Sequence, residues 1–106
     1  MTINEYTSHV LRTASTTEQD MHTLLNGLMG LCGESGECMD LMKKVMFQGH
    51  SIEEEQMAEE LGDVAFYLAL AVHAIGYDLE TVLQMNVDKL KKRYPNGFEA
   101  ERSINR

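Results

Sequence analysis

The 106-residue chain has few residues of several types, and each scarcity excludes a class of protein. One proline and eight glycines are fewer turn residues than a strongly punctuated all-β fold needs. Nine Lys and Arg against 17 Asp and Glu leave a net charge of −8. This balance argues against a nucleic-acid binder or a binder of anionic membranes, because both need a basic face. We therefore expect neither nucleic acid nor membrane as a partner.

Long apolar runs and paired cysteines are also missing. No stretch reaches the roughly 18 apolar residues of a membrane span, and the N-terminus has no basic, apolar leader. Cys32 and Cys38 are six residues apart in one expected helix, which is a rotation of about 240°. Their thiols therefore point to different faces and cannot pair with each other. A reduced, cytoplasmic chain is the simplest interpretation.

A helical period of apolar residues dominates the sequence and predicts an all-α, single-domain fold over residues 1–106. Helices are expected at about residues 3–12, 18–47, 51–76 and 79–94, followed by a tail at 98–106. Ser51 and Glu54 match a capping box at the start of the third helix. Asp78 is expected to cap the fourth helix, and glycines to end the second and third.

The second and third helices carry most of the apolar residues. One side of the second helix forms an apolar stripe, and the methionines on it are expected to fill the core: the stripe consists of Leu24, Leu28, Leu31, Ser35, Met39, Met42 and Met46. Residues 64–75 of the third helix are apolar nearly all round, which is typical of a helix buried on every side. Three short helices can hardly cover it. We predict a four-helix bundle whose core is completed by oligomerisation, as a homodimer or homotetramer.

Four carboxylates are the most informative residues: Glu34, Glu37, Glu60 and Asp63. Each pair is spaced i, i+3, so its members lie on one helical face about a turn apart. Each pair is also offset from the apolar stripe of its helix in the same rotational sense. In an antiparallel hairpin, residues at equal distance from the middle of the break lie at the same height. Glu34 and Asp63 are equally far from it, and so are Glu37 and Glu60, so each of these acids faces one on the other helix. The sequence predicts that all four converge beside the packing seam.

Such a cluster is unfavourable without a cation, since two unit charges about 4 Å apart repel by roughly 4 kcal/mol at an effective dielectric of about 20. Carboxylate oxygens suit hard divalent cations, so we predict a Mg²⁺ site, with Mn²⁺ as an alternative. A ferritin-like di-iron site would need Glu-x-x-His, and no glutamate has a histidine three residues later. The remaining alternative is a solvated acidic face with coincidental spacing.

Two further patterns each have two interpretations. Asn86, Lys89 and Arg93 share one face of the expected fourth helix. Its basic residues either clamp phosphate oxygens or complement the macrodipole at the helix C-terminus. The second helix has glycine at every third position over residues 27–36, and each costs about 1 kcal/mol relative to alanine. These glycines either allow close helix approach or leave room for a ligand beside the acids.

Together these motifs resemble the MazG-like branch of the all-α nucleoside triphosphate pyrophosphohydrolases. The pattern of that family is Glu-x-x-Glu, a spacer, and Glu-x-x-Asp, and here 22 residues separate Glu37 from Glu60. Residues 86–95 match the pattern Asn-x-x-Lys-x-x-x-Arg-Tyr-Pro, and residues 43–50 are similar to those of small phage and bacterial members. The resemblance covers about residues 24–98.

The resemblance implies Mg²⁺-dependent cleavage of a (d)NTP substrate to the monophosphate and pyrophosphate, for nucleotide-pool cleaning or phage nucleotide metabolism. It implies the four carboxylates as metal ligands, Glu37 and Glu60 as catalytic groups, and residues 86, 89 and 93 as substrate-binding. Many members have an acid where Gly33 stands, and Glu59 or Glu37 could replace it. Gly33 favours the alternative of a non-catalytic helical module that binds a nucleotide or a divalent ion. A purely structural helical dimer is a third hypothesis.

Overall fold

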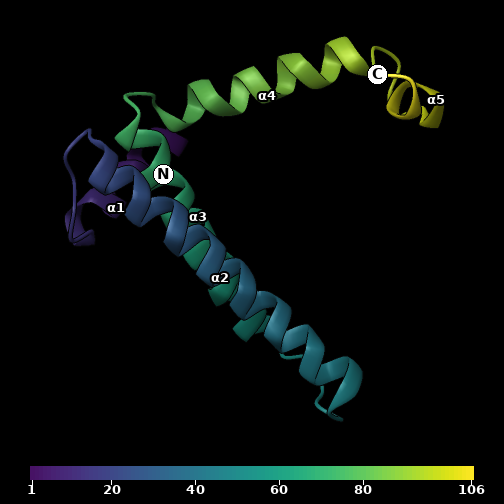
Figure 1. Ribbon diagram of the computed structural model, residues 1–106, viewed down its shortest axis with the longest axis horizontal. Coiled ribbons are helices and arrows are strands. Elements are labelled where there is room, and N and C mark those ends of the chain that lie inside the picture. Colours follow the sequence, from purple (N-terminus) through teal and green to yellow (C-terminus); the bar gives the residue numbers. More distant parts are fainter.

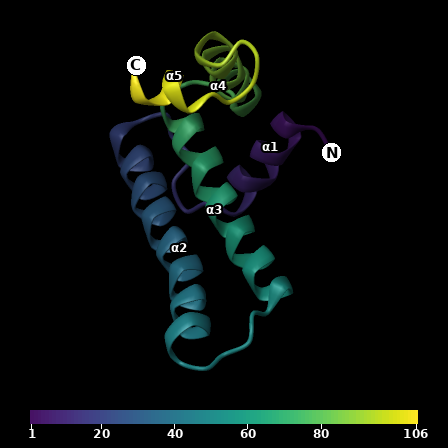
Figure 2. The same cartoon turned by 90° about the vertical axis from the view of Figure 1, so that its right-hand side faces the viewer.

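The fold is organised around a long antiparallel helical hairpin formed by α2 (Met21–Phe47) and α3 (Glu54–Ala74), as Figures 1 and 2 show. The computed structural model describes all 106 residues. Three further helices complete it: α1 (Ile3–Thr13), α4 (Leu79–Arg93) and the short α5 (Ala100–Ile104). No strand is present, so the all-α class is confirmed. The segment expected as a tail contains α5.

The remaining helices lie at one end of this hairpin. α1 packs on α3 near its C-terminal end (Figure 2), and α4 leaves that end at an angle of 97° to α3. The far half of α4 and all of α5 extend beyond the hairpin (Figure 1). The radius of gyration is 16.7 Å, whereas a compact chain of this length has about 13 Å. The four long helices of one chain therefore do not enclose a common core.

No single helix is both long and apolar enough to cross a membrane. Only α3 and α4 together reach the required length and composition, as a bent pair.

The helix starts show where local signals decide the fold and where they do not. Asp78 caps α4 as expected, with its carboxylate accepting from the Thr81 amide at 2.8 Å. Asp20 caps α2 in the same way, by accepting from the amide of Thr23. This helix therefore begins three residues later than predicted. The capping box predicted at Ser51 is wrong, because α3 starts at residue 54 without a side-chain cap. Residues 51–53 instead carry the chain across the end of the hairpin.

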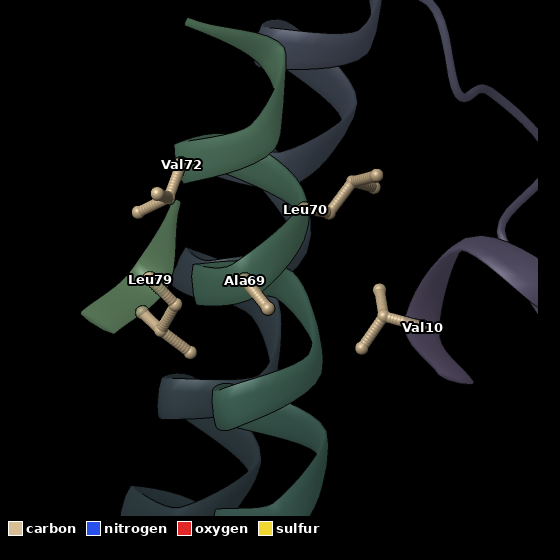
Figure 3. Packing of buried hydrophobic residues seen from close by; sticks show 5 residues of the cluster. All are labelled: Val10, Ala69, Leu70, Val72 and Leu79. Carbon is tan, nitrogen blue, oxygen red and sulfur yellow. The ribbon is translucent and has the colours of Figure 1, made fainter. Parts of the chain in front are cut away.

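The small hydrophobic core lies where α1, α3 and the start of α4 meet. It consists of Val10, Ala69, Leu70, Val72 and Leu79. In Figure 3, Leu70 points from α3 toward Val10 of α1, while Val72 and Leu79 lie on the other side of α3. Only nine residues of the chain are buried. The core thus anchors one end of the hairpin and leaves most of its length outside.

The seam between α2 and α3 follows glycines and not the predicted apolar stripe. A Cβ at Gly27 would lie 2.9 Å from backbone atoms of Ala71, and one at Gly30 would overlap the Tyr67 ring. Close helix approach therefore explains these two glycines. The prediction that the stripe methionines fill the core is wrong for Met39 and Met46, which are 70% and 67% exposed. The physical reason is that the glycine face lets the two backbones approach more closely than a face of long side chains.

Candidate metal centre

Three carboxylates converge on the seam of the hairpin, about midway along it. Glu34 comes from α2, and Glu60 and Asp63 come from α3. Each offers one oxygen, and these oxygens all lie within 4.8 Å of one another. Glu34 is one helical turn beyond Gly30, on the same face. The close contact at Gly30 therefore places the carboxylate of α2 against those of α3.

The electrostatics of this cluster are those of crowded like charges. The pKa of Glu60 is raised, first by partial desolvation and then by a hydrogen bond and charge repulsion from Glu34. Asp63 and Glu37 add to the repulsion. Crowded carboxylates can take up a proton or a cation to relieve it. Their oxygen donors suit a hard divalent ion.

Glu37 stands slightly apart from the other three acids. It is exposed and does not belong to the group whose oxygens converge, although its charge contributes to the raised pKa of Glu60. The space beside Gly33, where the resemblance would place a further acid, is open to 4 Å. Glu59 is exposed. The structure thus assembles three of the four predicted carboxylates and leaves the fourth at the rim.

Sequence reasoning missed Tyr6, which α1 brings toward the acids. Burial raises the pKa of this tyrosine, and the charge of Asp63 raises it further. Nothing in the local sequence indicates the proximity, because the residues are far apart in the chain. Only the packing of α1 on α3 creates it.

The predicted phosphate-binding residues lie elsewhere in the chain. Asn86, Lys89 and Arg93 are on α4, which turns away from the hairpin (Figure 1). A single chain therefore does not bring them to the acids. Lys89 and Arg93 form no ion pair within the chain. Arg93 instead lines an open hollow of about 410 Å³ at the C-terminal end of α4, together with three further cations that the sequence reasoning did not single out: Lys92, Arg102 and Arg106.

Comparison with known proteins places the sequence in a family. The family model for the MazG nucleotide pyrophosphohydrolase domain matches residues 19–98. A curated relative, the gene 37 protein of Mycobacterium phage L5, is 34% identical over 73 residues. This match covers 65% of the present chain and 64% of the relative, so the chain spans less than two thirds of that protein. No solved structure shows a significant match.

Proposed function

Since the chain belongs to the MazG nucleotide pyrophosphohydrolase family, we propose that it hydrolyses a nucleoside or deoxynucleoside triphosphate to the monophosphate and pyrophosphate. The reaction would depend on Mg²⁺, or alternatively Mn²⁺, and would serve nucleotide-pool cleaning or phage nucleotide metabolism in the cytoplasm. The similarity to a phage protein supports a role in phage nucleotide metabolism.

The convergence of Glu34, Glu60 and Asp63 is the observation that carries this proposal. These three residues would hold the divalent ion, because their oxygens come from two helices and already lie within 4.8 Å of one another. A bound Mg²⁺ would screen the triphosphate from the acids and polarise its phosphoryl oxygens. Carboxylates alone would repel the same substrate.

The carboxylates also supply the proton acceptor for an attacking water. Glu37 is exposed at the rim and lies outside the convergent group, so it remains available as the general base. Glu60 borders the same site and is the second catalytic group of this proposal.

We further propose that two or more copies of the chain assemble. The chain exposes 7778 Å², whereas a compact monomer of its mass exposes about 6,000 Å². The excess is about twice the roughly 800 Å² that each partner contributes to a standard interface. The solvent-exposed face of α2 offers apolar side chains for this contact, since Leu25, Met29 and Met39 are 56%, 66% and 70% exposed. Gly33 and Gly36 on that helix have open space for close helix approach.

Assembly also offers a route by which Lys89 and Arg93 reach the acids. In this proposal, α4 of one copy extends over the hairpin of its partner, where its cations bind the phosphates. Mixing inactive Arg93→Ala and Glu60→Gln chains tests it. A shared site predicts recovery of about a quarter of wild-type activity, because half the dimers are mixed and each has one intact site. No recovery would show that the two groups do not act in trans.

The hydrolysis itself is tested by incubating the protein with each (d)NTP and Mg²⁺ and measuring pyrophosphate and monophosphate. Glu60→Gln should abolish turnover. The matched control is Glu55→Gln, which changes an exposed glutamate of the same helix outside the cluster. The open position at Gly33 favours one second candidate, a non-catalytic nucleotide-binding module. That candidate predicts nucleotide-induced stabilisation in the wild type without release of pyrophosphate.

A further inference from the structure

A cavity of about 250 Å³ is lined by residues of the last turns of α2, the connecting loop and the first turns of α3. These segments form the closed end of the hairpin (Figure 2). The apolar wall of the cavity includes Leu41, Val45 and Met57. The cavity is lined by ten residues, of which five are hydrophobic.

The cavity lies on the same helical faces as the acid cluster. Leu41 follows Glu34 by seven residues, and Gln56 precedes Asp63 by seven, so each pair shares a face two turns apart. Two turns correspond to about 11 Å along the hairpin. The seam therefore leads from the carboxylates directly into the cavity, at a distance comparable to that between the phosphates and the base of a nucleotide.

The loop that closes the cavity has a defined backbone. Gly49 has a φ of 73°, a left-handed conformation that glycine adopts without strain. The amide of His50 then donates back to the carbonyl of Lys44 at 3.1 Å. This hydrogen bond holds His50 and Ser51 at the cavity, which both residues line.

The lining suits a planar, uncharged, polar ring. Apolar side chains can contact the faces of a ring, while the amide of Gln56 and the hydroxyl of Ser51 offer both donors and acceptors to its edge. A phosphate is disfavoured, because Lys44 is already paired with Asp40 at 2.9 Å and Glu53 adds a negative charge. One imidazole and one carboxylate are too few ligands for a metal.

We propose that this cavity binds the heterocyclic base of the nucleotide whose phosphates lie at the acid cluster, and that Gln56 reads the edge of that base. Gln56 would be a specificity-determining residue: it fixes which nucleotide is held and takes no part in the bond cleavage. This assignment rests on the proposed hydrolysis, since it places the base relative to phosphates held at the acids.

Titration with deoxynucleosides tests the cavity without phosphates, metal or turnover. The protein, labelled with ¹⁵N, is titrated with deoxyadenosine, deoxyguanosine, deoxycytidine and thymidine, and its amide signals are followed. At least one nucleoside should shift the amides of Ser51, Gln56 and Met57 in a saturable manner. Gln56→Ala should weaken that binding by about three- to tenfold, the worth of one hydrogen bond. Gln48→Ala is the matched control, because Gln48 is an exposed glutamine at the end of α2, beside the connecting loop, and does not line the cavity.

Kinetics of the (d)NTPs provide the second readout. Gln56→Ala should reduce the ratio of kcat/KM between the best and the worst base by about three- to tenfold, whereas Gln48→Ala should retain it. Nucleosides that leave the cavity amides unshifted, or a Gln56→Ala protein with wild-type affinity and selectivity, would overturn the base site. A wild-type protein that hydrolyses no triphosphate would instead overturn the proposed function, and the nucleoside titration would still decide the base site.

Discussion

The contact between α2 and α3 at Gly27 sets the geometry of the whole hairpin, and Gly27→Ala tests it. In a free helix this change should stabilise by about 1 kcal/mol. Here the new Cβ would meet three atoms of Ala71 at 2.9 Å, and two of these are backbone atoms that no rotamer change can move. Overpacking of this kind costs about 1–3 kcal/mol. Set against the helix-propensity gain, this leaves a net loss of up to about 2 kcal/mol, and each 1 kcal/mol lowers Tm by about 4–8 °C for a domain of about this size.

Gly62→Ala is the matched control, because Gly62 is also inside a helix and has nothing within 4 Å of its added Cβ. It should raise Tm by a few degrees through helix propensity alone. Both variants are compared by circular dichroism melting in EDTA. Gly27→Ala should also respond less to Mg²⁺, because separating the helices moves Glu34 away from Glu60. If Gly27→Ala melts as high as Gly62→Ala, the close approach of the helices is refuted.

Four further changes probe the core, the acids, the phosphate side and the assembly. Leu70→Ala empties a fully buried position and should cost about 2–5 kcal/mol in urea unfolding; a loss below 1 kcal/mol would contradict this core. Glu37→Gln removes one repelling charge, so in EDTA it should melt no lower than wild type, while hydrolysis is lost. A lower Tm with normal turnover would argue against Glu37 as the general base. Arg93→Ala should reduce kcat/KM about a hundredfold or more and retain Mg²⁺-induced stabilisation. Wild-type kinetics would show that Arg93 does not bind the phosphates and only complements the dipole of α4. Gly36→Ala should shift sedimentation at micromolar concentration toward the monomer, and an unchanged mass would exclude α2 packing at this glycine.

The sequence alone was enough to predict the four long helices and the position of the acid cluster along the hairpin, but not α5. The i, i+3 spacing of Glu60 and Asp63 determines which face they occupy as soon as the segment is helical. The short break makes α2 and α3 antiparallel, so distance from the break gives the height of Glu34. These are local properties of covalent geometry and hydrogen bonding, and they hold in whatever way the helices pack.

The tertiary structure decided which faces meet. Apolar periodicity favoured the leucine and methionine stripe of α2, but Gly27 and Gly30 let the backbone of α2 approach α3 on a different face. The direction of α4, the approach of Tyr6 to Asp63, and the cavity at the end of the hairpin are likewise absent from any local pattern. Each depends on the sum of many weak contacts between segments far apart in the chain. Spacing along one helix fixes the phase of its side chains, whereas the choice of partner surface is made only when whole helices compete for contact.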